Sequence, residues 1–477
     1  MALTRILLWL GNTLVMVAGL MVFTALFGLL LLEAEAAISM SVAAIVTGLL
    51  GGVLVLTTYA TPARETNFDA LVFLVLFWVF VPLLGALPYL TLGATDSLTV
   101  AVFESISAFT TTGASTLVPE AVPRSLLVWR SVLQWFGGVV VATFAVVILA
   151  SLNLTGTGIH RSMLFTLRKG ELFHRLVGIG RVIAGIYAVI AALGFVLMSV
   201  TGTAPFDAFN LALSGTATGG LTPRSGPLAD YLGPASAVVL ALLCFLGAAS
   251  VSAHWDLFRI RTMGGFRHFF RNIEHRALIL IFLALALIGA AYTGFRHVIV
   301  VTLEAAYLAS SAGYDYNVIG LELLPPALLI TVALIGGSAL STAGGLKLIR
   351  LLLLFRHLRV DLERLTHPSR VKPVIFRGRS ISDSAFLSVW MYFLGYTLVL
   401  GLGTLVFGTL GLPYDVAVPA SAASLANVGP LLEANMVLQG WADFTNAQLM
   451  TSSALMLVGR VEVLAILAVI SPRLWGN

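Results

Sequence analysis

Long apolar runs alternate with short polar segments along the whole chain, and their lengths predict membrane helices. Two such runs come first, at residues 6–32 and 37–59, and the polar segment 62–69 ends this pair. A helix needs about 20 apolar residues to cross the hydrocarbon core of a bilayer. The first run is too long for the core of a signal peptide and has no convincing cleavage site. We therefore expect residues 1–69 to form an N-terminal pair of membrane helices.

The rest of the chain repeats one pattern four times: a long apolar run, a shorter run that would cross half the membrane, and a second long run. We expect the outer helix, half-helix and inner helix of each repeat at 70–92, 98–111 and 126–152; 177–200, 206–217 and 235–255; 277–293, 298–311 and 326–355; 386–410, 416–427 and 444–470. The repeats occupy residues 70–155, 156–260, 261–370 and 371–477. Ten crossings leave little chain for a soluble domain. The predicted fold is an all-α polytopic membrane protein with four parallel repeats around a pseudo-fourfold axis.

A short string of small and hydroxyl residues, with glycine in fourth place, follows each half-helix. The strings are TTTGAST (110–116), TATGGLT (216–222), SSAGYDY (310–316) and ANVGPLL (426–432), with glycines Gly113, Gly219, Gly313 and Gly429. Carbonyl oxygens can replace the water around a monovalent cation, and glycine lets successive carbonyls turn toward one axis. One such string could equally be a surface for helix packing. Four at matching positions predict a cation filter made of Thr111, Thr112, Gly113, Ala217, Thr218, Gly219, Ser311, Ala312, Gly313, Asn427, Val428 and Gly429.

The distribution of basic residues predicts the orientation. Each repeat crosses twice and re-enters once, so all four strings open toward the same face, unlike the halves of an inverted-repeat carrier. The segments between repeats are rich in arginine and lysine: Arg161, Arg168, Lys169, Arg175, Arg259, Arg261, Arg267, Arg271, Arg276, Arg356, Arg359, Arg364, Arg370, Lys372, Arg377 and Arg379. Only a few, such as Arg124, Arg224 and Arg296, lie opposite. The positive-inside rule therefore puts both termini in the cytoplasm and the strings outside.

Composition narrows the function classes. Hydrophobic residues make up 59% of the chain and charged residues 10%, whereas soluble domains carry roughly a quarter charged residues. The net charge of +5 comes from short loops without interleaved aromatic residues, so it favours topology signals over nucleic-acid binding. The single cysteine, Cys244, excludes a disulfide framework. The scattered His254, His268 and His275, with no HExxH motif, argue against an enzyme.

The inner segment of the third repeat contains a glycine-rich interruption, GGSALSTAGGLK, at residues 336–347. Gly336, Gly337, Gly344 and Gly345 could form a packing surface of small residues, or they could unwind the helix into a loop that obstructs the ion path. We favour the loop. Lys347 ends it, and we favour its extension to the membrane interface over a gating contact, while keeping it among the candidate gating residues.

Several charged residues lie within predicted membrane segments, and Arg460, Glu104 and Glu304 are the candidates for a role in ion passage. Arg460 is about fifteen residues into the last inner helix, where an ionised guanidinium is costly without water or a partner. Glu462 lies on another face of that helix. Arg460 is thus either an ion-pair partner of a neighbouring helix or, as we favour, a positive barrier beneath the filter. Glu104 and Glu304, nine positions before their glycines, either attract cations or anchor the half-helices.

Five segments resemble the Trk/Ktr/HKT superfamily of potassium transporters, most closely its bacterial Trk-type pore subunit. They are ESISAFTTTGAST from Glu104, QWFGGVVV from Gln134, IGGSALSTAGGLKLIRLLLL from Ile335, ASLANVGP from Ala423 and LMLVGRVEVL from Leu455. The resemblance implies potassium uptake across the bacterial cytoplasmic membrane, with the four glycines in the filter, residues 336–347 as gating loop and Arg460 beneath the filter. It also implies a homodimer with one pore per subunit and a cytoplasmic ring of TrkA-like nucleotide-binding subunits. This chain has no dinucleotide or Walker A motif of its own, so we expect no cofactor on it besides the transported K⁺.

The strings are not identical, which leaves two alternatives open. Gly219-Gly220, Gly313-Tyr314-Asp315 and Pro430 make the expected ring asymmetric and its selectivity less strict. In plant relatives a serine at the first filter glycine accompanies sodium transport, so Gly113 favours potassium over a sodium-permeable transporter. A solute carrier with a site at the membrane midplane would instead need inverted halves.

Overall fold

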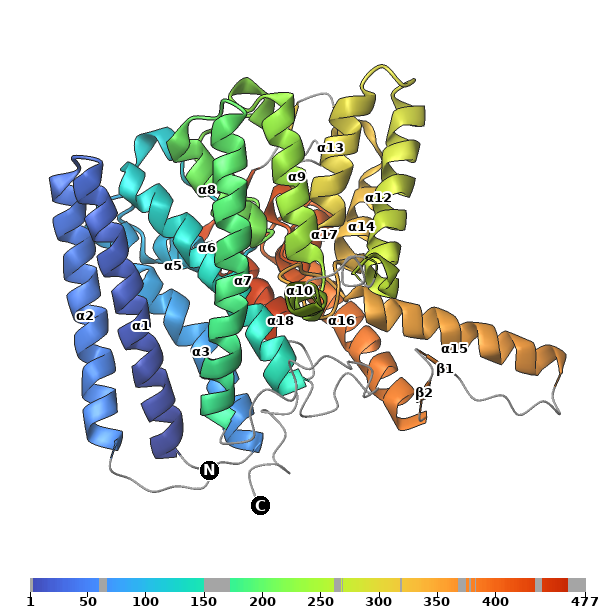
Figure 1. The fold of residues 1–477 in the computed structure, drawn as a ribbon, viewed down its shortest axis with the longest axis horizontal. Coiled ribbons are helices and arrows are strands. Elements are labelled where there is room, and N and C mark those ends of the chain that lie inside the picture. The colour runs from blue at the N-terminus through green and yellow to red at the C-terminus, as the bar shows by residue number, and fades with distance from the viewer. Residues whose placement is uncertain are drawn as a thin grey trace.

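The computed structural model describes residues 3–59, 67–149, 172–260, 267, 269–317, 320–367, 375–376, 379–381, 383–433 and 440–461. These residues are almost entirely helical (Figure 1). Strands β1 (Ile375–Phe376) and β2 (Arg379–Ser380) form one small antiparallel pair within them. Some residues named in the predictions lie outside the described residues: Arg161, Arg168, Lys169, Arg261, His268, Arg370, Lys372, Arg377 and Glu462.

The N-terminal pair consists of α1 (Leu3–Leu30) and α2 (Ala34–Thr58), which lie side by side at one edge of the molecule (Figure 1). The two helices approach closely where Gly11 faces Gly51. A Cβ atom on Gly11 would lie only 2.8 Å from the carbonyl oxygen of Gly51. Glu33, between the two helices, accepts hydrogen bonds from the backbone N–H groups of Arg124 and Ser125, both at 2.9 Å. The pair is therefore tied to the first repeat.

All four repeats contain the expected outer helix, half-helix and inner segment. In order, they are α3 (Asn67–Gly85) with α4 (Leu87–Thr91), α5 (Leu98–Phe109) and α6 (Arg124–Phe144); α7 (Leu172–Val200), α8 (Pro205–Thr216) and α9 (Pro234–Ala248) with α10 (Val251–Ile260); α12 (Ile273–Tyr292), α13 (Val298–Ala309) and α14 (Pro326–Ile335) with α15 (Leu348–Thr366); α16 (Asp383–Thr409), α17 (Tyr414–Ala426) and α18 (Asn446–Val461). Single-turn helices lie at Pro119–Ala121, Leu228–Asp230, Leu321–Leu323, Gly429–Leu431 and Trp441–Asp443, and a π-helical turn at Ala145–Leu149 extends α6.

Two inner segments are broken, and the sequence pattern predicted only one of the breaks. Residues 336–347 are unwound between α14 and α15, as expected of a loop rather than a continuous helix, and obstruction of the ion path stays a prediction. The inner segment of the second repeat, expected as one helix over 235–255, instead bends by 103° between α9 and α10. This expectation was wrong because the break at Ala249–Ser250 contains neither proline nor glycine, and the isolated Gly247 before it is tolerated within a helix. The bend depends on contacts with residues far away in sequence, described below.

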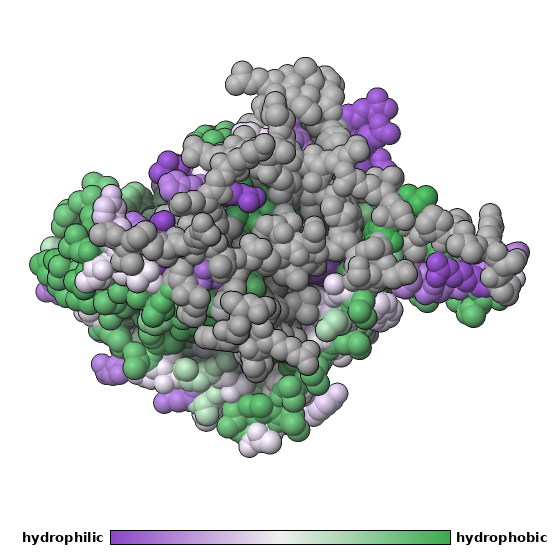
Figure 2. Space-filling model, turned by 90° about the horizontal axis from the view of Figure 1, so that it is seen from below, coloured by the Kyte–Doolittle hydropathy of each residue, from purple (hydrophilic) through white to green (hydrophobic). Residues whose placement is uncertain are grey.

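Burial separates the centre of the molecule from its lipid-facing periphery. Of the most apolar stretch of α6, 94% is buried, against 28% for α2 and 22% for α16. Seven described helices are long and apolar enough to cross a membrane, or eight if α9 and α10 count as one bent span. Apolar residues cover the flanks, while the protruding α15 carries both hydrophilic and apolar residues on its surface (Figure 2). The four half-helices therefore lie inside a shell of apolar helices.

Candidate functional site

Each half-helix ends in the same backbone turn. The chain enters the left-handed region at Thr111, Thr218, Ser311 and Asn427, with φ of +54°, +52°, +62° and +54°. The next residue then donates its N–H to a carbonyl five residues back in every repeat, at 2.9 Å in all four: Thr112 to Ser107, Gly219 to Ser214, Ala312 to Tyr307 and Val428 to Ala423. Left-handed backbone is costly for residues with a side chain. Its recurrence at four matching positions shows that the four strings are one structural motif.

This turn corrects the register of the second string. Gly220, with φ of +79°, occupies the place of Gly113 (+81°) and Gly313 (+69°), whereas Gly219 matches Thr112. A seven-residue link gives the same alignment, because the Ser107 hydroxyl donates to the carbonyl of Ala114 and the Ser214 hydroxyl to that of Leu221. Two adjacent glycines made the sequence ambiguous at this point. Gly220 thus joins the candidate site, and Gly429 has no positive φ.

The four strings form a closed ring in chain order. A Cβ atom on Gly113 would overlap the carbonyl oxygen of Gly219, one on Gly220 would lie 2.5 Å from that of Ala312, one on Gly313 would lie 2.9 Å from Val428 Cγ1, and one on Gly429 would overlap the backbone N of Ala114. The ring closes between the fourth and first strings, where the Gly429 N–H donates to Thr112 O at 2.6 Å and Asn427 Nδ2 donates to Thr112 Oγ1 at 2.9 Å. A side chain at these glycines would push neighbouring strings apart.

Two buried carboxylates hold the return segments, the stretches that lead from each string to its inner helix. Glu104 accepts hydrogen bonds from the Thr116 N–H at 2.5 Å and the Ser115 hydroxyl at 3.0 Å, and lies 3.8 Å from Arg130. Glu304 accepts from the N–H of Leu321 at 2.5 Å and of Asn317 at 3.1 Å. This geometry favours the anchoring interpretation. Leu211 and Ala420 lie nine residues before Gly220 and Gly429, so the second and fourth strings have no such carboxylate.

Other side chains hold those two strings, and the sequence analysis did not single them out. Gln134 Nε2 on α6 donates to the carbonyl of Gly219 at 2.7 Å, and Trp441 Nε1 donates to that of Gly429 at 3.0 Å. The hydroxyl of Tyr314 in the third string donates to Ser214 Oγ at 2.5 Å. Only the QWFGG segment gave a signal, since it begins at Gln134. The ring is thus supported differently at each of its four positions.

The intramembrane loop, residues 336–347, lies directly against the ring. The hydroxyls of Thr342 and Thr218 are 3.0 Å apart, and the Gly344 N–H donates to Ser311 Oγ at 2.9 Å. A Cβ atom on Gly344 would overlap the carbonyl of Ala426. The loop therefore contacts the second, third and fourth repeats at or beside their left-handed residues.

Close contacts between glycines also shape the loop itself. Gly336 and Gly345 both have φ of +73°, and a Cβ atom on Gly345 would lie 2.8 Å from the backbone of Gly336. Gly337 packs against the side chain of Ala343. The two ends of the loop can meet in this way only without side chains.

Arg460 joins the loop to the first string. Its Nε donates to the carbonyl of Thr110 at 2.5 Å, its Nη1 to that of Thr342 at 2.6 Å, and its Nη2 to the Thr111 hydroxyl. These partners are neutral oxygens, so the described residues do not show the ion pair with a neighbouring helix. Lys347 is also buried, and its Nζ donates to the carbonyl of Ala343. The alternative in which Lys347 extends to the membrane interface is therefore wrong.

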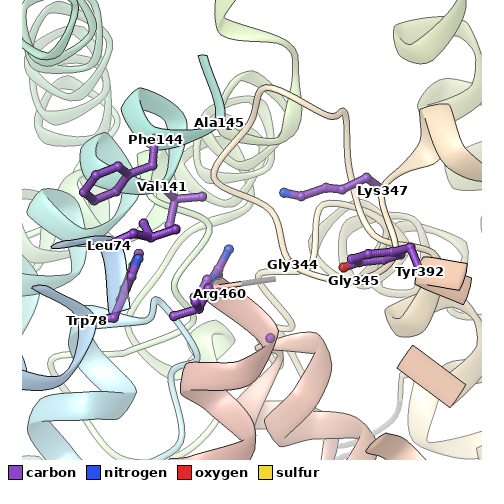
Figure 3. A pocket seen from close by; sticks show the side chains of 12 residues that line it. Leu74, Trp78, Val141, Phe144, Ala145, Gly344, Gly345, Lys347, Tyr392 and Arg460 are labelled. Atoms are coloured by element: carbon purple, nitrogen blue, oxygen red, sulfur yellow. The ribbon is translucent and has the colours of Figure 1, made fainter. Parts of the chain in front are cut away.

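A small cavity of about 30 Å³ adjoins this cluster. Arg460 and Lys347 both point toward it, and Trp78, Val141 and Phe144 of the first repeat form the opposite wall (Figure 3). One water molecule needs a cavity of roughly 10–15 Å³, measured as the volume open to the centre of a water-sized sphere. It can hold about two waters, which is too little room for an organic solute.

Two polar links hold the return segment of the second repeat, one to the first repeat and one to its own half-helix α8. Glu120 accepts hydrogen bonds from the hydroxyl (2.6 Å) and backbone N–H (2.8 Å) of Ser225, and these bonds hold the pKa of the Glu120 carboxyl below its usual range. Arg224 and Asp207 form an ion pair at 2.7 Å. One of the few basic residues on this face is therefore neutralised by a partner.

Four re-entrant half-helices whose glycine strings close into a ring inside a shell of membrane helices define a class of protein: membrane transporters that pass cations through the protein. Comparison with known proteins names the family. The family model TrkH, described as a cation transport protein, matches residues 39–475. The chain belongs to this family, which confirms the resemblance seen in the sequence, and it is a transporter rather than an enzyme.

Individual relatives agree with this assignment over most of the chain. The Trk system potassium uptake protein TrkH of Salmonella typhimurium is 30% identical over 419 residues, covering 85% of this chain and 86% of that protein. The Trk system potassium uptake protein TrkI of Halomonas elongata is 28% identical over 432 residues, covering 88% and 86%. The crystal structure of the potassium transporter TrkH from Vibrio parahaemolyticus superposes with a TM-score of 0.89 at 27% identity over all of both chains.

Proposed function

We propose that this chain is the ion-conducting subunit of a Trk-type potassium uptake system in a bacterial cytoplasmic membrane. The observation that carries the proposal is the closed ring, in which each string meets the next in chain order. The similar proteins that are named as potassium uptake proteins support K⁺ as the ion. The positive-inside rule supports cytoplasmic termini and strings that face outward.

The ring is the selectivity filter in this proposal. Its residues are Thr111, Thr112, Gly113, Ala217, Thr218, Gly219, Gly220, Ser311, Ala312, Gly313, Asn427, Val428 and Gly429. Carbonyl rings select a monovalent cation by replacing its water. The carbonyls of Gly219 and Gly429 accept side-chain hydrogen bonds, so we expect unequal contributions from the four strings and incomplete exclusion of Na⁺.

The loop and its basic residues form the gate. Gly336, Gly337, Gly344, Gly345 and Lys347 shape the loop, and Arg460 fastens it to the first string. A guanidinium beneath the ring repels a cation leaving it. Ions pass when the loop and Arg460 separate from the ring.

We also propose the partners that the Trk system implies: a second copy of this chain and a cytoplasmic ring of nucleotide-binding subunits. The protruding α15 supports a cytoplasmic contact, because Arg359 and Arg364 lie exposed on it. Such contacts between exposed charges weaken as salt rises. A pull-down at two salt concentrations, with Arg359 and Arg364 replaced by alanine, tests this contact.

The direct test of the function is ion flux. Purified protein in liposomes should take up ⁸⁶Rb⁺, K⁺ should compete better than Na⁺, and expression should restore growth at low potassium in a host without its own uptake systems. Equal competition by Na⁺ would support the sodium-permeable transporter instead. Uptake that requires an organic solute would support a carrier and contradict the proposal.

A further inference from the structure

The corner between α9 and α10, at Ala249–Ser250, leaves backbone groups that need partners. Helices end with unpaired carbonyls and begin with unpaired N–H groups, and here both ends lie inside the protein. The intramembrane loop pairs with them. The Ser338 N–H donates to Ala248 O at 3.0 Å, the Thr342 N–H donates to Gly247 O at 3.2 Å, and the Val251 N–H donates to Leu340 O at 2.8 Å. The corner and the loop are thus one hydrogen-bonded unit built from two repeats.

Two consecutive residues in the first turn of α12, Glu274 and His275, bind this unit, one at the loop and the other at the corner. The Glu274 carboxylate accepts the N–H of Ala339, in the loop, at 2.8 Å. His275 Nε2 accepts the N–H of Ser250, at the corner, at 3.0 Å. His275 Nδ1 therefore carries the proton and donates to the carbonyl of Phe269 at 2.8 Å. Both side chains are fully buried.

The position of the Glu274 carboxylate, buried at the start of a membrane helix, needs an explanation. A buried carboxylate in a membrane protein is costly and rarely serves packing alone. Glu274 binds the loop and His275 binds the corner, so these two contacts lie outside the strings themselves. Both residues lie where α12 begins, at the end of the basic stretch that the sequence places in the cytoplasm.

We propose that Glu274 and His275 are positioning residues that clamp the loop and the corner to α12 and so keep the loop against the ring. The proposal rests on the proposed role of the loop as a gate and adds the point at which the gate is held. The loop leaves the ring together with the corner when this clamp opens. A displacement of α10 or α12 at the cytoplasmic side thereby reaches the loop without passing through the filter.

The test uses Glu274→Ala, His275→Ala and the double variant, each as the full chain in liposomes. Removing one acceptor from a buried N–H shifts a local equilibrium by about tenfold. We expect basal ⁸⁶Rb⁺ flux per folded molecule to rise about tenfold in each single variant. The double variant should give less than the product, because both residues hold one unit. Glu274→Gln keeps an oxygen acceptor and should restore most of the closed behaviour.

A matched control is Glu33→Ala, which also removes a carboxylate from backbone N–H groups, at the start of α6 and far in sequence from the loop. It should lower thermal stability without raising flux. If Glu274→Ala behaves like Glu33→Ala, the residue only stabilises the fold and the proposal is overturned.

Hydrogen exchange provides a readout that does not depend on transport. In Glu274→Ala the amide of Ser250 should exchange faster as well as that of Ala339, and in His275→Ala the amide of Ala339 should do the same. If each variant frees only its own partner, the clamp does not act as a unit. A wild-type protein that fails to carry ⁸⁶Rb⁺ would overturn the proposed function, whereas the exchange experiment would still decide the clamp.

Discussion

The two sides of the ring are held by different kinds of contact. The return segments are fixed mainly by side chains of fixed helices, such as Glu104 on α5 and Glu304 on α13. The other side is held by a loop without helical structure, which is bonded to several repeats at once and fastened by one arginine. Because the contacts of Glu104 and Glu304 each lie within one repeat whereas those of the loop span repeats, we expect the ring to keep its shape while the loop is displaced. Selection and obstruction can thus reside in separate parts of the molecule.

The largest effect on ion selectivity should come from breaking the ring itself. Gly113→Ser and Gly220→Ser add a side chain where φ is positive and where a Cβ atom meets the next string. The backbone cost alone is about 1–2 kcal/mol, a factor of roughly 5–30. We expect the preference for K⁺ over Na⁺ to fall by at least this factor in competition assays of ⁸⁶Rb⁺ uptake.

Gly219 provides the comparison for the register. The backbone at Gly219 has a negative φ, and a Cβ atom there would meet the side chain of Gln134 rather than the next string. Gly219→Ala should therefore damage selectivity less than Gly220→Ala. The reverse order would contradict the structural alignment of the second string, and unchanged ratios in all serine variants would remove the filter assignment.

The next prediction concerns thermal stability and the two carboxylates, Glu104 and Glu304, that hold the return segments. Glu104→Ala leaves Arg130 buried without its charged neighbour, and breaking a buried pair costs roughly 3–5 kcal/mol; both side chains are almost fully buried. Glu304→Ala leaves backbone N–H groups without a partner, which costs about 1–3 kcal/mol. Thermal unfolding in detergent should show the larger loss for Glu104→Ala. Equal losses of thermal stability in the two variants would mean that the unpaired charge of Arg130 adds little to the cost of Glu104→Ala.

The smallest effect is the pH dependence of the link between Glu120 and Ser225. Because the pKa of Glu120 is lowered in the folded protein, the link contributes its full stabilisation above the unfolded pKa of about 4.3. That contribution is lost as the pH falls through the lower, folded value. Unfolding temperatures measured between pH 3 and 6 should converge for wild type and Glu120→Gln at the acid end. A constant difference would exclude this titration as the cause.

Hydrophobic periodicity and the repeated strings predicted most of this architecture. Apolar run lengths predicted the helices of each repeat, and the glycines at 336–347 predicted the unwound loop, because both are properties of local sequence. The corner at Ala249–Ser250 was missed, since its bend depends on hydrogen bonds to the loop about ninety residues away. Burial of Lys347 was also unpredictable, because its carbonyl partners exist only once the loop has folded back.

The register of the second string shows a further limit. Gly219 and Gly220 are equivalent in a pattern of residue types, and the left-handed turn at Thr218 and the link from Ser214 to Leu221 distinguish them in the structure. Likewise, the sequence showed that Arg460 needed a partner, but not that the partners would be Thr110, Thr111 and Thr342 from two other repeats. Side chains that join distant segments leave little local signal.

The most direct test of separate selection and obstruction is ⁸⁶Rb⁺ flux with K⁺ and Na⁺ competition in wild type and Arg460→Ala. Arg460 fastens the loop but also touches the first string, so the variant tests both sides at once. Removing its three hydrogen bonds and its charge should raise basal flux while the ratio of K⁺ to Na⁺ competition stays at the wild-type value. A deletion within residues 336–345 should also raise basal flux without changing the competition ratio. Combined with Arg460→Ala, it should raise flux by less than the product of the two single increases. Unaltered or reduced flux in a correctly inserted protein, or a selectivity that falls together with the barrier, would contradict the account.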